Sequence, residues 1–503
     1  MKQSNRLKWN TIASFAVQIA AILSSFIVPK CILNAYGSAA NGIVSSITSF
    51  LGFLTLMESG VGSVARAELY RPVASKDTEQ VSAVLNATQD FFRKVAALYM
   101  IFVAAFAVVF PLTIDTGENY WYTFSLVLII AVTNLMQYYF GAGYMQVLYA
   151  DQKLYILYSI QAFSYLLSVV LTIWLTNIGT GIHVVKLVSA LVFIIRPVVV
   201  HFYVKKKYCI RSDAVSKGPV LKQKWNNMLQ TIAYFVHSKT DVIVLTIFCT
   251  FEDISVYSVY SMITTGLSSV ISSLCNGFTS RIGSQYGRKD EKLQDTFSAY
   301  ELFVCNITVI CFVTAACMIQ EFISIYTGNL TDAEYRQPVF GIMLILAEAA
   351  YCIRIPYNNM VSAAGHFRQT QYAAVMEAGI NIVLSVVLVW KYGLIGVAVG
   401  TVIAMVYRTV YLVIYLSRNI LNRSIWKFLK KIMVFGCVSL VSVLAAKCIT
   451  AFIHPDSYLI WAEKSLVTLI ITAAAVGGVD LTLFRRETQM LFGEFFGKEK
   501  KKQ

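Results

Sequence analysis

Three ionisable residues lie inside one apolar run of the chain, where a membrane-spanning helix would meet hydrocarbon. His237, Lys239 and Asp241 stand in the middle of the run NMLQTIAYFVHSKTDVIVLTIF. A charge near the centre of a spanning helix costs about 2.5 to 3.5 kcal/mol, so it is retained where it meets a partner, water or a ligand. At 100° per residue, His237 and Asp241 share one helix face and Lys239 points to the other side. We therefore predict in this run either a functional site or an ion pair that holds neighbouring helices together.

Ionisable residues also lie in other apolar runs, and basic residues predominate among them. The cations that we predict to bind a ligand are Lys30, Lys186, Arg196, Lys239, Arg354 and Arg408, and the acids that we predict to couple an ion are Glu58, Asp241, Glu348 and Glu377. A surplus of buried cations calls for an anionic ligand, and the planar donor fork of arginine suits phosphate. A phosphate-bearing amphiphile would satisfy this set. The alternative is snorkelling, in which Lys30 and Lys186 reach the outer membrane interface, and Arg196 and Arg408 reach the inner interface from within about two turns of it.

The composition predicts a polytopic membrane protein. Of 503 residues, 57% are hydrophobic and 14% are charged, whereas about half and about a quarter are usual in soluble domains. The apolar runs are long and unbroken, which favours spanning helices over the short alternating strands of a barrel. We predict an all-α protein with fourteen spans, at residues 9–33, 41–64, 95–114, 122–142, 154–176, 184–204, 228–249, 254–277, 300–326, 338–357, 371–390, 393–416, 432–452 and 465–484.

Basic residues are distributed unevenly between the two sides of these spans. Of the 42 Lys and Arg residues, three lie in predicted outer loops and seven inside spans, which leaves 32 on the inner side. This bias predicts that both termini are cytoplasmic. The net charge of +15 is then mainly a membrane-surface feature that attracts anionic lipid. A nucleic-acid partner is not predicted, because no basic domain stands free of the membrane.

Short matches recur along the chain at nearly one separation. Lys8-Trp9-Asn10 recurs as Lys224-Trp225-Asn226, Lys76-Asp77 as Lys289-Asp290, the SVVL run at 168–171 as 385–388, and Arg196 as Arg408, at separations of 216, 213, 217 and 212. Such ordered matches predict two homologous halves of six spans each, related by an axis along the membrane normal. The predicted domains are a six-helix lobe at 1–204, a basic cytoplasmic linker at 205–225, a six-helix lobe at 226–416, two further helices at 417–484 and a basic cytoplasmic tail at 485–503.

The segment before the third span predicts an amphipathic helix. It runs from Arg66 to Lys94, and we expect the helix to begin after Arg71-Pro72. Such a helix would lie in the headgroup region on the cytoplasmic side.

Sequence signatures of enzymes are missing from the chain. It contains no GxxxxGK[ST] loop, which ATP-driven pumps use to hold phosphate, and no HExxH motif. The connecting loops are too short for a catalytic domain, and the carboxylates in the spans stand singly rather than in pairs. We therefore predict that the protein is not an enzyme and uses no cofactor and no metal.

Several short motifs along the chain occur together in one known family. They are Pro29-Lys30, Tyr36-Gly37, Asn41-Gly42, Glu58-Ser59-Gly60, Ala150-Asp151-Gln152-Lys153, Thr240-Asp241, Ala363-Ala364-Gly365-His366 and the run Asn381–Ser385. With fourteen spans arranged as 6+6+2, the chain resembles the polysaccharide flippases, which are the O-antigen and capsular repeat-unit translocases of the multidrug/oligosaccharidyl-lipid/polysaccharide exporter superfamily. The resemblance extends over the whole chain.

The resemblance implies movement of undecaprenyl-diphosphate-linked oligosaccharide from the cytoplasmic to the outer leaflet of the bacterial inner membrane. It implies alternating access between two lobes, a cationic cavity for the diphosphate and sugar, and spans 13 and 14 beside the lipid tail. Partners implied by it are membrane lipid, a polysaccharide polymerase and export proteins. Two alternatives stay open at this point. They are a cation-coupled drug exporter of the same superfamily, disfavoured by fourteen spans and a cationic set, and a membrane-embedded lipid-linked sugar transferase.

Overall fold

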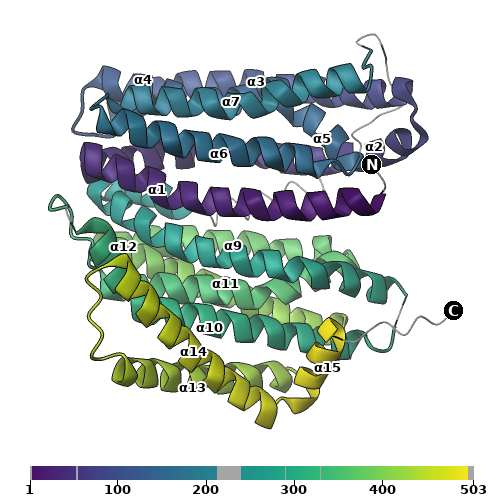
Figure 1. Ribbon diagram of the computed structural model, residues 1–503, viewed down its shortest axis with the longest axis vertical. Coiled ribbons are helices and arrows are strands. Elements are labelled where there is room, and N and C mark those ends of the chain that lie inside the picture. Colours follow the sequence, from purple (N-terminus) through teal and green to yellow (C-terminus); the bar gives the residue numbers. More distant parts are fainter. Residues whose placement is uncertain are drawn as a thin grey trace. The chain divides into compact units, whose positions relative to one another are not determined.

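The structure is a computed structural model, and it describes residues 3–52, 55–211, 214, 239–288, 290–328 and 330–496. These residues form helices joined by turns and short loops, and no β-strand occurs among them (Figure 1). The chain divides into two compact units, Met1–Ser255 and Val256–Gln503. The predicted all-α fold is thereby confirmed, whereas the limits predicted for the individual domains stay a prediction.

Long helices that run side by side build each unit (Figure 1). The first unit contains α1 (Gln3–Leu51), α2 (Thr55–Ser75), α3 (Thr78–Thr113), α4 (Tyr120–Met136), the π-helix η2 (Gln137–Gly141), α5 (Ala142–Ala150), α6 (Leu154–Asn177), α7 (Ile182–Lys207) and a helical segment at 239–248. Next come α9 (Phe251–Gly287), which continues into the second unit, α10 (Leu293–Thr327), α11 (Pro338–Ala364), α12 (Phe367–Asn419), α13 (Trp426–Ile449), α14 (Tyr458–Thr482) and α15 (Arg485–Phe496).

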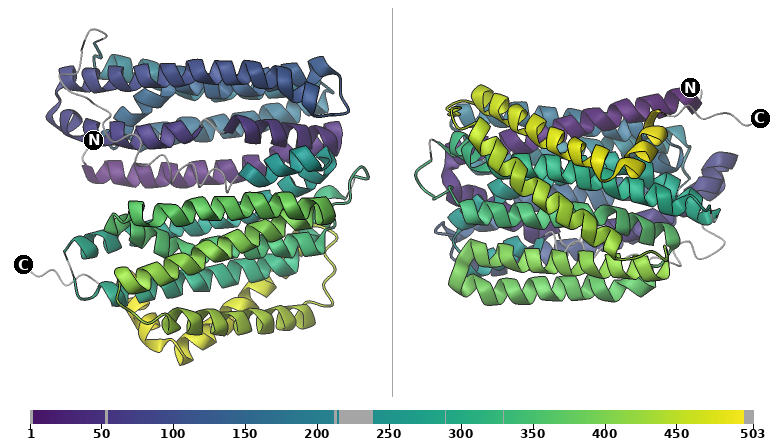
Figure 2. Two further views of the ribbon diagram at one scale, coloured as in Figure 1. Left: turned by 180° about the vertical axis from the view of Figure 1, so that it is seen from behind. Right: turned by 90° about the horizontal axis from the view of Figure 1, so that it is seen from below.

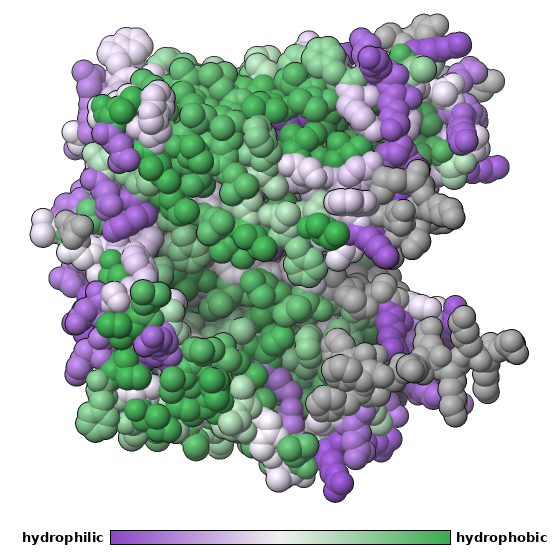
Figure 3. Space-filling model, viewed as in Figure 1, coloured by the Kyte–Doolittle hydropathy of each residue, from purple (hydrophilic) through white to green (hydrophobic). Residues whose placement is uncertain are grey.

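Eleven helices of the described residues are long and apolar enough to cross a membrane. Two of them, α1 with 49 residues and α12 with 53, contain enough residues for about 75 Å of helix at 1.5 Å per residue, which is more than twice the thickness of a bilayer core. The helix α12 holds two of the predicted spans, and α1 holds the first span and the beginning of the second, 41–64, which continues in α2. Thirteen predicted spans are thus accounted for, and the other, 228–249, lies mostly outside the described residues. Apolar side chains cover the flanks of the helices, and hydrophilic ones gather at their ends (Figure 3).

Glycines divide both of these long helices. Gly37 has φ 82° in α1 and Gly393 has φ 52° in α12, and each interrupts the helical backbone. A side chain at these dihedral angles would be strained, so glycine is the residue that allows the chain to turn between spans. After the first turn, Gly42 packs so closely on the start of α9 that an added Cβ would lie 1.9 Å from the Phe251 carbonyl oxygen. Neighbouring Asn41 donates to Ser255 at 2.8 Å.

The amphipathic helix predicted to begin after Arg71-Pro72 begins later, at Thr78. Pro72 lies inside α2, where its carbonyl accepts from the Asp77 backbone N–H at 3.0 Å and helps to close the helix end. The Asp77 side chain then accepts from the Gln80 N–H at 3.0 Å and caps α3. The prediction was wrong because an aspartate that satisfies the first free N–H groups sets the start of a helix more strongly than the proline does. From there α3 continues without a break through the third predicted span.

The fourth span bends at η2 and continues as α5. The amide of Gln89 on α3 donates to the carbonyl of Tyr139 at 2.5 Å and so satisfies a backbone group of the π-helical turn. Two glycines let the backbones approach here, since a Cβ on Gly141 would lie 2.7 Å from Pro197 and one on Gly143 would lie 2.6 Å from Gln89. Local π-turns of this kind are frequent at functional sites. In this unit α5 then packs mainly against α2 and α3, and also against α7.

The last helices pack on α10 through buried polar groups. Lys464 on α14 donates to Glu321 on α10 at 2.6 Å, and Asn306 on α10 donates to Asp480 on α14 at 2.5 Å. Both α13 and α14 lie along the side of the second unit, away from α11 (Figures 1 and 2). Polar pairs between spanning helices contribute modest energy but fix which helices meet. These pairs therefore attach the predicted two-helix appendage to the second unit.

Candidate functional site

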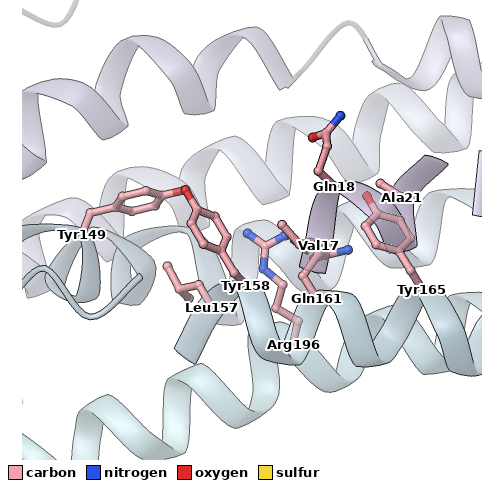
Figure 4. A pocket seen from close by; sticks show the side chains of 9 residues that line it. All are labelled: Val17, Gln18, Ala21, Tyr149, Leu157, Tyr158, Gln161, Tyr165 and Arg196. Atoms are coloured by element: carbon pink, nitrogen blue, oxygen red, sulfur yellow. Dashed lines mark hydrogen bonds between the residues drawn. The ribbon is translucent and has the colours of Figure 1, made fainter. Parts of the chain in front are cut away.

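A pocket of about 280 Å³ opens in the first unit around Arg196 (Figure 4). Its lining comes from α1, α5, α6 and α7, and consists of Val17, Gln18, Ala21, Tyr149, Leu157, Tyr158, Gln161, Tyr165 and Arg196. The side chains of Tyr149 and Tyr158 point toward each other, and the guanidinium of Arg196 lies beside Gln161 (Figure 4). Among these nine lining residues, Arg196 carries the one charge. The pocket therefore combines a cation with amides and aromatic rings.

Neutral groups hold the Arg196 guanidinium. One terminal nitrogen donates to the Gln161 side-chain oxygen at 2.5 Å, and the other contacts the sulfur of Met145 at 2.8 Å. Its Nε is buried and has no hydrogen-bond partner in the described structure. A guanidinium offers five N–H donors, and a thioether is a weak acceptor. Arg196 thus keeps both its full charge and unused donors for an anionic ligand.

A second arginine, Arg66 on α2, lies next to this pocket. Its guanidinium stacks on the Tyr149 ring, 3.9 Å from the ring centroid. It also donates to the side-chain oxygen of buried Gln146 at 3.2 and 3.3 Å. The charges of Arg66 and Arg196 both act on the hydroxyl of Tyr158. The sequence-based prediction missed Arg66, because it ended the second span at residue 64 and counted this arginine with the inner loop.

Arg354 and Arg408 occupy a different environment in the second unit. Both guanidiniums pair with the carboxylate of Glu377, Arg408 at 3.4 Å and Arg354 at closer range. All three side chains are buried, with 5 to 8% exposure. The structure therefore brings three predicted site residues together, but it neutralises one of the two cations. These arginines differ from Arg196 in having a carboxylate partner rather than in their donors, since Nε of all three is buried without a partner in the described structure.

The two predicted repeats thus hold their matched arginines, Arg196 and Arg408, in different surroundings. Arg196 meets Gln161, and Arg408 meets Glu377. Gln161 and Glu377 are 216 residues apart, within the separations of 212 to 217 residues that relate the predicted repeats. An amide in the first half takes the place of a carboxylate in the second. Since a carboxylate neutralises an arginine and an amide does not, we identify the first unit as the one with an available cation.

The other predicted residues do not line the Arg196 pocket. Lys30 on α1 and Lys186 on α7 are partly buried, as is Lys239, and Asp241 is 2% exposed. Glu348 accepts from Ser268 at 2.5 Å within the second unit. His237 and the side chain of Glu58 lie outside the described residues. No group of three His, Cys, Asp or Glu side chains that could hold a metal ion occurs in the part of the chain that the structure describes.

A buried ionic cluster near the start of α10 was not predicted. Glu301, 1% exposed, accepts from Arg423 at 2.6 and 3.1 Å and from Lys431 at 2.8 Å, and Tyr357 also donates to it. Arg423 lies outside the spanning helices, and although burial lowers its pKa, the charge of Glu301 and the hydrogen bonds raise the pKa above its ordinary value. The cluster joins α10 and α11 to the loop before α13. Glu301 lies two turns into α10 but only one residue inside the predicted span 300–326, where span limits are uncertain by a few residues, and the sequence analysis therefore missed it.

A second ionic cluster lies on the loop between α5 and α6. The Asp151 carboxylate accepts from Arg6 at 3.2 Å and also pairs with Lys153 and with the hydroxyl of Tyr208. Burial raises the pKa of Asp151, but the hydrogen bonds from Lys153 and Tyr208 and the charges of Lys153 and Arg6 outweigh it, so the pKa lies below its ordinary value. This cluster explains the Ala150-Asp151-Gln152-Lys153 motif as a structural joint between α1, α6 and the end of α7.

Comparisons with known proteins identify the fold. The MatE family model matches residues 227–387, and a comparison with curated proteins finds no match. The structure shares its fold with solved proteins of the MOP superfamily, as the predicted resemblance implies.

Three solved structures illustrate this similarity. The lipid II flippase MurJ in an inward closed conformation is 16% identical, with a TM-score of 0.70 over 94% of this chain and 99% of MurJ. An inward-facing multidrug resistance MATE family transporter of the MOP superfamily is 14% identical, with a TM-score of 0.57 over 81% and 95%. A MOP superfamily transporter from Pyrococcus furiosus, described as having a binding pocket of reverse polarity, is 14% identical, with a TM-score of 0.57 over 82% and 95%. At these identities the similarity shows the fold.

Proposed function

We propose that this protein is a flippase for polyprenyl-diphosphate-linked oligosaccharide. In this proposal it moves repeat units of surface polysaccharide from the cytoplasmic to the outer leaflet of a bacterial inner membrane, with both termini in the cytoplasm. The observation that carries the proposal is the Arg196 pocket, in which an arginine without a carboxylate partner stands among three tyrosines and two glutamines. A lipid-linked diphosphate with a sugar attached offers an anion for the arginine and hydroxyls for the amides.

The diphosphate would bind between Arg196 and Arg66. Arg196 has unused donors toward the pocket, and Arg66 is held by Gln146 and Tyr149 at its edge. The pocket is smaller than a whole lipid-linked oligosaccharide, so it accommodates the charged linkage, and the polyprenyl tail stays in lipid. Transport by alternating access further requires that the ligand binds the inward-open and outward-open states unequally. If Arg196 and Arg66 both contact the diphosphate in only one of these states, the affinities of the two states for the ligand would differ as required.

The other ionisable residues take supporting roles in the proposal. Lys30, Lys186 and Lys239 would bind the anionic substrate elsewhere on its path, and Arg354 and Arg408 would do so when Glu377 releases them. Glu58, Asp241, Glu348 and Glu377 would couple transport to a cation. No residue has a catalytic role, and polysaccharide polymerase and export proteins are the proposed partners.

A proteoliposome assay with defined substrates tests the proposal. Purified protein is reconstituted with a fluorescent polyprenyl-diphosphate oligosaccharide, and the fraction of substrate accessible to an added glycosidase is followed. We expect the wild type to accelerate translocation, Arg196→Gln to abolish it, and Arg196→Lys to retain part of it, because lysine keeps the charge but not the fork. Arg93→Gln is the matched control, since Arg93 is 52% exposed and pairs on the surface with Asp90. Equal rates with wild type, Arg196→Gln and empty liposomes would refute the proposal.

A cation-coupled exporter of small molecules is the second candidate. It is favoured by the MatE match over residues 227–387 and by the buried carboxylates Asp241 and Glu377, since such carboxylates can carry a proton or bind a cation. The same proteoliposomes distinguish the two functions. Efflux of a cationic dye driven by a proton or sodium gradient, without translocation of lipid-linked sugar, would establish the exporter.

A further inference from the structure

Tyrosines form one continuous face on the second half of α12. Tyr407, Tyr411 and Tyr415 follow at intervals of four residues, which places them in one row along the helix. Their ring centroids are 6.4 and 6.2 Å apart, and the rings of Tyr411 and Tyr415 are parallel within 7°. All three are partly exposed. We call these three residues the tyrosine face, and at 1.5 Å per residue it extends for about 12 Å along the helix.

Two more tyrosines border the tyrosine face. Tyr372, on the first half of α12, lies near Tyr407, and Tyr286 at the end of α9 lies near Tyr415. Tyr372 is 66% exposed. The rings therefore come from two helices and both halves of α12, all within the second unit.

Polar groups distinguish the tyrosine face from a surface made for lipid tails. The Tyr415 hydroxyl bonds to Nδ1 of His366 at 2.9 Å, and the Tyr411 hydroxyl donates to the Gln369 carbonyl at 3.5 Å. Tyr407 and Tyr411 also lie near Arg408, which belongs to the buried cluster with Glu377. The lipid side of the same helix is apolar, with Ile403, Val406 and Val410 each 45 or 46% exposed. An interfacial aromatic belt would account for Tyr415 near the helix end but not for a row that continues two turns deeper.

We propose that the tyrosine face is a sugar-binding surface, on which the rings of the oligosaccharide stack. The electron-rich face of an aromatic ring attracts the weakly positive C–H groups of a pyranose, and phenol hydroxyls exchange hydrogen bonds with sugar hydroxyls. Tyrosine presents this area with little loss of side-chain freedom, because two torsions set its position. The row is long enough for successive sugar rings. This inference rests on the proposed flippase function and names the part of the substrate that the second unit binds.

The test compares two lipids that differ in the sugar alone. Binding of a polyprenyl diphosphate carrying a short oligosaccharide and of the same polyprenyl diphosphate without sugar is measured for detergent-purified wild type, Tyr411→Leu, Tyr411→Phe and the double variant Tyr407→Leu/Tyr411→Leu. Stacking energies of about 1 kcal/mol per ring correspond to about fivefold in affinity. We expect each substitution by leucine to lower the affinity for the glycosylated lipid about fivefold and the substitution by phenylalanine to lower it less than twofold. The affinity for the sugar-free lipid should be the same in all variants.

Controls separate a local effect from a general one. Tyr392→Leu, at a 52% exposed position near the kink of the same helix, should leave both affinities unchanged. Thermal unfolding in detergent identifies variants that fail to fold. If a leucine variant fails to fold, Tyr411→Phe and Tyr372→Leu replace it in the comparison of the two lipid affinities. Equal loss of both lipids, or no loss of either with leucine, would overturn the inference.

Failure of the proposed function gives a different pattern. If wild-type protein binds neither lipid, the flippase function is refuted. Binding of sugar to the tyrosine face is then tested separately by saturation-transfer NMR with the free oligosaccharide. Transfer that is present in the wild type and lost in the leucine double variant supports the sugar-binding surface. Absence of transfer in the wild type overturns it.

Discussion

Replacing Gln161 by glutamate should close the Arg196 pocket to anions. Gln161→Glu changes an amide oxygen 2.5 Å from the Arg196 guanidinium into a carboxylate, with almost no change in size. The variant would give the first unit the arginine–carboxylate pair that Arg408 and Glu377 make in the second. The introduced carboxylate would pair with Arg196. A lipid diphosphate would then have to displace this carboxylate from the guanidinium and would be repelled by its negative charge.

The size of the effect follows from the geometry. Two unit charges about 4 Å apart interact by about 4 kcal/mol at an effective dielectric constant near 20, which corresponds to about a thousandfold in affinity. Arg196 is partly exposed, and pairs in contact with water contribute about 1 kcal/mol or less, which is about fivefold. We therefore expect Gln161→Glu to weaken binding of a polyprenyl diphosphate by at least about fivefold and by up to about a thousandfold.

Binding in detergent, measured by microscale thermophoresis at two salt concentrations, checks this prediction. Gln80→Glu adds the same charge at an exposed position in the first turn of α3 and should bind as the wild type does. Gln161→Leu removes the hydrogen bond without adding charge, so it should lower the affinity for the diphosphate less than Gln161→Glu does. If Gln161→Glu and wild type bind the diphosphate within a factor of two, Arg196 is not the phosphate site.

Three further predictions concern stability and topology. Glu301→Gln leaves two buried cations without their carboxylate and should destabilise the second unit by about 3 to 5 kcal/mol, seen as a lower melting temperature in detergent; an unchanged melting temperature would contradict the buried cluster. The stabilisation by Asp151, whose pKa is lowered on folding, should be present above its unfolded pKa of about 3.9 and lost as the pH falls through the folded value. The difference in melting temperature between wild type and Asp151→Asn should thus be constant from about pH 5 to 8 and shrink at lower pH, and a difference that grows on acidification would refute the pairing. Cysteines introduced at 115–120 should label from outside intact cells and those at 212–218 should not, and the reverse labelling would overturn the charge-based orientation.

The fold could be predicted because its determinants are local and repeated. Each span needs about 20 apolar residues, and the excess of Lys and Arg in alternate loops predicts which side of the membrane those loops occupy. The predicted start of the helix before the third span was wrong because two nearby residues both favour a helix start. Pro72 suggested a helix start, but Asp77 provides the cap that begins α3.

The candidate site could be predicted in part. Arg196 was recognised because a cation in an apolar run is costly and needs a reason. The pairing of Arg354 and Arg408 with Glu377 could not be read from the chain, because these three residues lie on separate helical segments that meet only after packing. Arg66 was missed for a related reason, since its contact with Tyr149 depends on how far α2 extends as a helix beyond the predicted span.

The difference between Gln161 and Glu377 gives the two halves different tasks within the proposed mechanism. Duplicated halves start with equal sites, and two sites with free arginines would hold a diphosphate in both lobes and in both leaflet-facing states. Uniform binding of that kind cannot shift a conformational equilibrium, because a ligand biases two states only by its difference in affinity for them. In this mechanism, Glu377 is paired with both arginines, so the second unit would bind anions weakly unless that carboxylate is displaced, whereas Arg196 would bind without that condition. A change of one amide for one carboxylate is therefore sufficient to make the halves unequal, and it makes anion binding in the second unit dependent on the charge of Glu377.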